Sequence, residues 1–156
     1  MKKIIFLLLF VGSLVANDIF VLPKDSKKLE DRLSYEILNA KKDIFIAMYN
    51  FSYKKIAKDL INSSKNGVKI TVLLDKSKVE DDSEVYNLLK SNDINVVFKD
   101  SVKKMHLKTI LIDNRLAMIG SMNFTKKSFK ENLDIVYFSN DDVLISKLKE
   151  IRENFK

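Results

Sequence analysis

The chain has 156 residues, of which 46% are hydrophobic, so it is long enough for one domain with a buried core. It contains no cysteine and one histidine, which excludes a disulfide framework and a thiolate nucleophile and argues against a structural zinc site. The formal net charge of +7 suits a polyanion or an anionic membrane surface as partner, although a lysine-rich composition alone would give the same charge.

The first sixteen residues are typical of a secretory signal. Two lysines precede an apolar run that begins at Ile4, and small residues lie near Ala16. The run is shorter than the roughly 20 residues of a membrane-spanning helix, and Leu14 stands where a cleavage site favours a small residue. We therefore predict an exported protein (periplasmic, secreted or membrane-associated) in which residues 1–16 are a signal peptide or an N-terminal membrane anchor.

Helix and strand patterns alternate along the rest of the chain. Residues 17–26 are predicted as a linker and residues 27–156 as the folded domain. Apolar spacing predicts helices over about 27–41, from Ser52 to near Gly67, over 82–91 and from Asp141 onward, and strands over 43–49, 68–75, 94–99, 106–113, 116–120 and 133–139. This order predicts an α/β fold in which α-helices sandwich a mixed β-sheet.

Strand parity brings several polar side chains to one place. His106 and Lys108 share one face of their strand, and Ser121 and Asn123 share parity after the next strand. A hairpin turn at Asp113 can bring the two pairs side by side. An imidazole, an ammonium, a hydroxyl and an amide together could hold a phosphate and attack it. Asp113 has the opposite parity, which predicts a structural role.

These residues carry a motif with fixed spacing. The string H-x-K-x4-D-x6-G-S-x-N resembles, position for position, the HKD signature of the phospholipase D superfamily. The pair Glu131-Asn132 that follows is similar to a Glu-Asn pair of the short, single-motif bacterial endonucleases of the Nuc type. The motif residues are His106, Lys108, Asp113, Gly120, Ser121 and Asn123.

The resemblance implies a fold, a reaction and residue roles. It implies that residues 27–156 form a phospholipase D-like half-unit that dimerises and acts as a nuclease. One histidine forms a phosphohistidine and a second protonates the leaving oxygen, with no metal or other cofactor. The implied catalytic residues are His106, Lys108, Asn123 and Glu131, the phosphate ligands are Lys108, Ser121 and Asn123, and the structural positions are Asp113, Gly120 and Asn132.

The single histidine predicts the oligomeric state. Two histidines are needed and no second copy of the motif is present, because the similar stretch 70–78 lacks the required His and Lys. We therefore expect a homodimer with twofold symmetry, in which His106 of each chain faces its mate. Glu131 would orient the imidazole by accepting from the nitrogen not used for attack.

The substrate is open to three interpretations. Lysines around the motif could follow a nucleic-acid backbone, and aromatic residues could stack on bases; these are Lys99, Lys103, Lys104, Lys126, Lys127, Lys130, Tyr53, Phe124 and Phe129. They favour an exported, metal-independent endonuclease acting on DNA, with single strands and RNA left open as substrates. The alternatives are a phospholipid hydrolase, helped by a retained membrane anchor, and a non-catalytic DNA-binding module of an uptake system.

Overall fold

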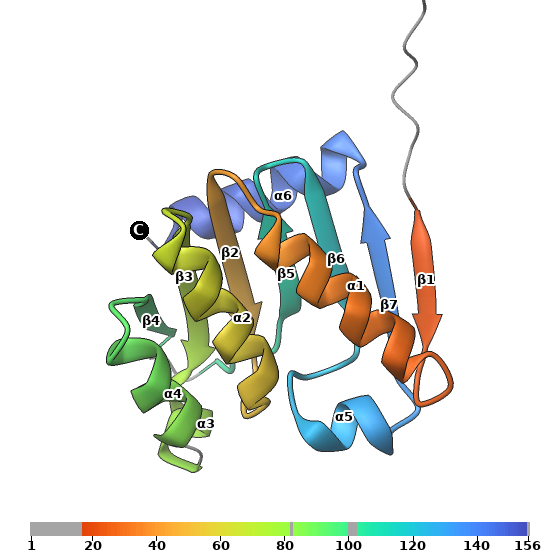
Figure 1. Ribbon diagram of the computed structural model, residues 1–156, viewed down its shortest axis with the longest axis horizontal. Coiled ribbons are helices and arrows are strands. Elements are labelled where there is room, and N and C mark those ends of the chain that lie inside the picture. The colour runs from red at the N-terminus through yellow and green to blue at the C-terminus, as the bar shows by residue number, and fades with distance from the viewer. Residues whose placement is uncertain (1–16, 82, 100–102, 156) are drawn as a thin grey trace, which may run out of the picture.

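The computed structural model describes residues 17–81, 83–99 and 103–155 (Figure 1). The predicted leader, residues 1–16, lies outside the described residues. Within the described ranges, no helix combines the length and apolar character needed to cross a membrane.

A seven-stranded mixed sheet forms the centre of the domain, in the order β1-β7-β6-β5-β2-β3-β4. The pairs β2–β3 and β3–β4 are parallel and the other pairs are antiparallel. The strands are β1 (Asp18–Val21), β2 (Asp43–Met48), β3 (Lys69–Asp75), β4 (Asn95–Lys99), β5 (Lys108–Ile112), β6 (Leu116–Gly120) and β7 (Ile135–Ser139).

Helices cover both faces of the sheet, which confirms the predicted α/β class. In Figure 1, α1 and α2 lie in front of the sheet and α6 lies behind it. The helices are α1 (Ser26–Leu38), α2 (Lys54–Lys65), α3 (Lys76–Asp81), α4 (Ser83–Lys90), α5 (Lys126–Lys130) and α6 (Asp142–Glu153). The predicted helix over 82–91 is confirmed as α4. The helices α3 and α5 were not predicted, because six and five residues are too few to show a helical period.

Alternating side chains of the central strands supply two hydrophobic clusters. In β2, Ile44, Ile46 and Met48 pack toward α1 and α2, whereas Phe45 and Ala47 pack toward α6. All five are at most 1% exposed. A strand that is buried on both faces reads as a continuous apolar run, which explains why the stretch 43–49 was recognisable in the sequence.

The predicted linker over residues 17–26 is wrong. Asp18–Val21 forms β1, which pairs antiparallel with β7, and α1 begins at Ser26. Strand β1 is only four residues long and alternates between half-buried and exposed residues, so it differs from the fully buried strands of the centre of the sheet. Its strand conformation depends on hydrogen bonds to β7, which the local sequence does not reveal.

The strands begin and end at two opposite edges of the sheet. We call the edge where β1, β2 and β6 end and β5 and β7 begin the lower edge, as it is drawn in Figure 1, and the opposite one the upper edge. The β5–β6 turn lies at the upper edge. Its central residues, Asp113 and Asn114, have φ angles of 52° and 54°, which match a type I′ hairpin turn.

Candidate active site

The motif residues gather at the lower edge. His106 lies in the segment before β5, whose first residue is Lys108, and Ser121 and Asn123 follow β6 directly. Because β5 and β6 are neighbours in the sheet, this placement brings the two halves of the motif together. Asp113 alone lies at the other end of β5, at the upper edge.

His106 and Lys108 are in direct contact. The Nζ atom of Lys108 lies 3.0 Å from Nε2 of His106 and 2.9 Å from the carbonyl oxygen of the same residue. Lys108 is 8% exposed, whereas His106 is exposed. Burial lowers the pKa of Lys108 below its ordinary value, and the nearby Asp134 carboxylate partly opposes that effect. An ammonium at this distance donates to the lone pair of Nε2, and that lone pair becomes free for attack when the ammonium turns to another acceptor, such as a phosphoryl oxygen.

Tyr49 contacts both members of this pair. Its ring centroid lies 4.6 Å from that of His106 in an edge-on arrangement, and Nζ of Lys108 lies 5.2 Å from the ring centroid. The backbone N–H of Tyr49 donates to the carbonyl oxygen of Leu107 (2.9 Å). Both the ring and the backbone of this residue thus restrict the positions of the imidazole and the ammonium.

A buried carboxylate holds the segment that leads to His106. Asp75, at the end of β3, accepts the backbone N–H of Met105 (2.8 Å) and both the N–H and the hydroxyl of Ser77. Burial alone would raise the pKa of Asp75, but these hydrogen bonds outweigh it, so the pKa lies below its ordinary value. Asp75 therefore fixes the backbone immediately before the candidate nucleophile.

Asn123 is oriented by the loop after β2. Its Oδ1 accepts the backbone N–H of Asn50 (3.2 Å), so the amide presents its NH2 group as the donor side. Next to it, the backbone of Phe124 exchanges hydrogen bonds with residues of the same loop, and Phe51 and Phe124 form an isolated parallel bridge. The loop therefore positions the amide as a hydrogen-bond donor for an anion.

Gly120 and Ser121 meet the start of β7 closely. A Cβ atom at Gly120 would lie 2.3 Å from the carbonyl oxygen of Ile135, which leaves room for glycine only. The Ser121 hydroxyl donates to Oδ1 of Asp134 (2.6 Å) and accepts the N–H of Ile135 (3.1 Å). Ser121 is thus engaged with β7 as well as adjacent to the phosphate site that the motif implies.

Asp134 is a site residue that the sequence analysis missed. Its carboxylate binds Ser121 and lies close enough to Lys108 to influence the pKa of that ammonium. Its second oxygen, Oδ2, is buried and has no hydrogen-bond partner in the described part of the chain. A buried carboxylate oxygen without a hydrogen-bond donor is costly, which makes Asp134 an unusual carboxylate beside the motif.

Glu131 and Asn132 lie at the end of α5. Glu131 is exposed, and its backbone N–H donates to the carbonyl oxygen of Lys127 (2.9 Å). Among the described residues, no hydrogen bond joins its side chain to His106. Asn132 is half-buried, and its side-chain amide approaches Ser128. The expected role of Glu131 therefore stays a prediction, and the carboxylate that the structure brings beside Lys108 is that of Asp134.

Asp113 binds backbone rather than site residues. Its carboxylate accepts the N–H groups of Lys41 (2.9 Å), Lys42 (2.7 Å) and Asp43 (3.2 Å), which precede and begin β2. Burial alone would raise the pKa of Asp113, but these hydrogen bonds and Arg115 hold it below its ordinary value. Asp113 ties the β5–β6 turn to the start of β2.

The aromatic residues expected to stack on bases are mostly unavailable. Phe124 and Phe129 are fully buried, so the expectation that they contact bases is wrong. The hydroxyl of Tyr53 donates to Glu30 (2.9 Å), and burial, followed by Glu30, raises its pKa to about 12. By contrast, several of the flanking lysines are exposed: Lys103, Lys104, Lys126, Lys127 and Lys130.

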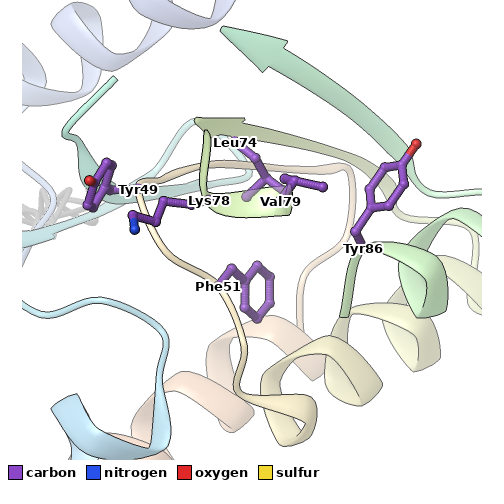
Figure 2. Close-up of a pocket in the computed structure, with 6 residues that line it drawn as sticks. All are labelled: Tyr49, Phe51, Leu74, Lys78, Val79 and Tyr86. Carbon is purple, nitrogen blue, oxygen red and sulfur yellow. The ribbon is translucent and has the colours of Figure 1, made fainter. Parts of the chain in front are cut away.

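A small pocket adjoins the site through Tyr49. Figure 2 shows the amine of Lys78 pointing toward the Tyr49 ring, and the Nζ atom lies 5.7 Å from the ring centroid. The pocket is lined by Tyr49, Phe51, Leu74, Lys78, Val79 and Tyr86.

In the part of the chain that the structure describes, no group of three or more His, Cys, Asp or Glu side chains could hold a metal ion.

Comparison with known proteins assigns the family. A family model described as "Cardiolipin synthase, PLD-like domain" matches residues 33–156. The chain belongs to the phospholipase D superfamily. It is 33% identical over 109 residues to a phospholipase D of Rickettsia prowazekii, covering 68% of this chain and 52% of that protein. A mitochondrial cardiolipin hydrolase of Xenopus laevis is 24% identical over 114 residues, covering 73% of this chain and 54% of that protein. The chain therefore spans about half the length of these superfamily relatives.

Two solved structures share the fold of this chain. Nuc from Salmonella typhimurium, described as a phospholipase D family member, matches with a TM-score of 0.82 and 22% identity, covering 90% of this chain and 93% of that one. NucT from Helicobacter pylori matches with a TM-score of 0.79 and 22% identity, covering 90% and 95% of the two chains. The predicted resemblance to a Nuc-type phospholipase D-like half-unit is confirmed at the level of the fold.

Proposed function

We propose that the protein is an exported, metal-independent phosphodiesterase that hydrolyses nucleic acid through a phosphohistidine intermediate. The observation that carries the proposal is the 3.0 Å contact between Nζ of Lys108 and Nε2 of His106. It couples a nitrogen nucleophile to an adjacent cation, which is the pairing that attack on a phosphodiester needs.

The reaction would proceed in two displacements. Nε2 of His106 forms a bond to phosphorus while the P–O bond to the leaving group breaks, and a second imidazole protonates the leaving oxygen. That imidazole then takes a proton from water, whose oxygen displaces His106 and releases the phosphate product. Lys108 and the NH2 group of Asn123 supply positive charge and hydrogen bonds to the phosphoryl oxygens.

A homodimer would supply the second imidazole. The chain has one histidine, and exposed apolar residues mark a free surface on the face of the sheet that α6 covers only in part. Val21 pairs with Ile135 across β1 and β7, both are exposed, and Ile19 (63% exposed) points to the same face. A contiguous exposed apolar patch supports contact with a second copy there.

Asp134 is our candidate for the carboxylate that orients an imidazole. It would act through Lys108, because the carboxylate lies close to that ammonium and Nζ of Lys108 contacts Nε2 of His106. Glu131 remains the alternative that the motif resemblance suggested.

Nucleic acid is the substrate that the charge distribution supports. The exposed lysines before and after the motif, among them Lys103, Lys104 and Lys127, could track a polyanionic backbone. A phospholipid is the second candidate, because Leu107 next to His106 and Leu133 (84% exposed) next to Asp134 place apolar side chains beside the site. A relative named as a phospholipase D supports the same alternative.

Export belongs to the proposal and depends on residues 1–16. Two lysines followed by an apolar run support translocation, with cleavage or retention of the segment left open. Mass spectrometry of the N-terminus in fractionated cells tests it. A pool that retains Met1 in the cytoplasm, away from membranes, would contradict export.

The decisive experiment is an activity gel with DNA in excess EDTA. The wild-type protein should cut DNA, the His106→Ala variant should not, and fluorescent phospholipid vesicles assayed in parallel should stay intact. Loss of activity on chelation with recovery in Mg²⁺ or Zn²⁺ would refute the metal-independent mechanism. Turnover of lipid but not of DNA would favour the second candidate.

A further inference from the structure

Helix α3 brings a second lysine to the candidate site. Strand β3 is parallel to β2 and therefore also ends at the lower edge, with Leu74 in register with Met48. Helix α3 begins directly after β3, and Lys78 is its third residue. The Lys78 side chain is half-buried, and Figure 2 shows its amine pointing toward the ring of Tyr49. Lys78 is therefore close to the site although it lies outside the motif.

The ring of Tyr49 is close to two ammonium groups. The Nζ atoms of Lys78 and Lys108 lie 5.7 Å and 5.2 Å from its centroid. The two nitrogens are therefore at most about 11 Å apart, which is the total of the two distances. Because a lysine has a flexible stem and rotatable donors, each ammonium can turn from the ring to an anion. A strand that places one phosphate on Lys108 can thus place a neighbouring phosphate on Lys78.

A buried carboxylate fixes the position of Lys78 relative to His106. Oδ1 of Asp75 accepts the backbone N–H (3.1 Å) and the hydroxyl (2.6 Å) of Ser77, the residue before Lys78. Oδ2 of the same side chain accepts the N–H of Met105 (2.8 Å), the residue before His106. Asp75 is 5% exposed, so little water competes for these hydrogen bonds. The fold itself therefore holds the helix that carries the second lysine beside the segment that carries the nucleophile.

We infer that Lys78 binds the phosphate next to the one that His106 attacks, so that the site recognises consecutive phosphates of one strand. The inference rests on the proposed function and narrows its substrate to a phosphodiester polymer. A nucleic acid carries a phosphate at every nucleotide, whereas a substrate with a single phosphodiester offers no second phosphate to Lys78. Lys78 is thus a specificity-determining residue that takes no part in the displacement at phosphorus.

Dinucleotides with and without a terminal phosphate test this role. In the wild type, a phosphate added to the 5′ or the 3′ end of a DNA dinucleotide should raise kcat/KM about fivefold through KM, the size expected of a single ion pair. The ratio of kcat/KM between the two substrates should be close to one in Lys78→Ala and should persist in Lys78→Arg, which keeps the charge. Because each ratio compares two substrates of one variant, a general loss of activity does not change it.

Lys65→Ala is the matched control. Lys65 is exposed and ends α2, shortly before β3 begins at the upper edge, so its substitution removes the same charge far from the site. This variant should keep the wild-type ratio. A wild-type ratio close to one for both ends, or an unchanged ratio in Lys78→Ala, would overturn the inference.

The salt dependence of binding tests the phosphate contact without turnover. In the His106→Ala background, Lys78→Ala should reduce the slope of log K against log salt concentration for a single-stranded oligonucleotide by about 0.7, the value for one phosphate contact. Lys65→Ala in the same background should leave the slope unchanged, and equal slopes for the two double variants would overturn the inference. If the wild type cleaves neither oligonucleotide nor dinucleotide, the proposed function is refuted, and the slope still decides whether Lys78 binds phosphate.

Discussion

Two carboxylates near the C-terminal end of the motif allow a direct comparison at the residue scale. Asp134 binds Ser121 and lies near Lys108, whereas Glu131 is exposed at the end of α5. They stand three positions apart in the sequence. Glu131 was the predicted residue because it begins the Glu-Asn pair that resembles the pattern of the Nuc-type endonucleases. The structure distinguishes them because β7 starts next to the end of β6 and carries Asp134 to the site.

We predict that Asp134→Asn lowers kcat by about 10²-fold, the effect of a misplaced catalytic group. The matched variant Glu131→Gln should keep wild-type turnover, because among the described residues no hydrogen bond joins its side chain to His106. Steady-state kinetics on DNA, with melting temperatures measured alongside, checks both. The reverse ranking would restore Glu131 as the orienting residue.

Asp113 has a large expected effect on stability. The Asp113→Asn substitution removes a charged acceptor from three backbone N–H groups, and we expect a loss of about 2 kcal/mol in the free energy of unfolding. Because the folded-state pKa is lowered, the carboxylate stabilises the protein fully above its unfolded-state pKa of about 4, and this stabilisation is lost as the pH falls through the folded-state pKa.

The measurement is the melting temperature of both proteins from pH 7 to pH 3. The gap between wild type and Asp113→Asn should be constant down to about pH 5 and should narrow below about pH 4. Turnover per folded molecule should fall much less than in His106→Ala. An unchanged melting temperature with equally complete loss of activity would contradict a structural role for Asp113.

At the scale of elements, the site depends on the close approach of β6 and β7. Gly120 pairs with Val136, and the next backbone N–H, that of Ser121, donates to the carbonyl oxygen of Ile135 (3.0 Å). The two strands can approach this closely only where β6 ends in a residue without a side chain. The same approach brings Ser121 and Asp134 into hydrogen-bond contact.

We therefore predict that Gly120→Ala destabilises the domain by about 1–3 kcal/mol, because the new Cβ would meet the Ile135 carbonyl oxygen at 2.3 Å. Gly67→Ala is the informative comparison. Gly67 has a φ of 89° but open space around it, so its cost comes from backbone strain alone and should leave the site intact. Chemical denaturation and turnover separate the two, since only Gly120→Ala should also lower the activity of the folded protein.

At the scale of the whole molecule, the proposed dimer makes a quantitative prediction. Wild type refolded together with excess His106→Ala should form heterodimers with one imidazole, and both histidines belong to one site. Activity should therefore fall with the square of the wild-type fraction. Refolding with the exposed variant Lys65→Ala should leave activity unchanged. A linear fall, or full activity in a demonstrable monomer, would show that one histidine suffices.

The proposed contact surface can be tested with a matched pair. Ile19 and Tyr35 are 63% and 62% exposed, but Ile19 lies on the exposed sheet face and Tyr35 lies on α1 in the opposite layer. Ile19→Asp should shift the protein to a monomer and abolish activity, whereas Tyr35→Asp should change neither. Light scattering and the DNA assay check both, and a dimer that survives Ile19→Asp would place the interface elsewhere.

The sequence by itself determined the family, the mixed α/β class and the position of the HKD motif. These features depend on local patterns: apolar runs for buried strands, and fixed spacing between polar residues that two neighbouring strands bring together. Lys108 and His106 stand two positions apart, and the prediction that they lie together holds although the strand begins only at Lys108.

Only the tertiary structure decided the features that depend on contacts between distant segments. β1 became a strand through pairing with β7, Phe124 and Phe129 became core through the packing of α5 and the loop after β2, and Asp134 reached Lys108 through the pairing of β6 with β7. The sequence could not show them because a short edge strand, an aromatic residue or a lone carboxylate has no distinctive local pattern. Whether such a segment forms a strand, and whether such a side chain is buried or joins the site, depends on which other segment of the folded chain packs against it.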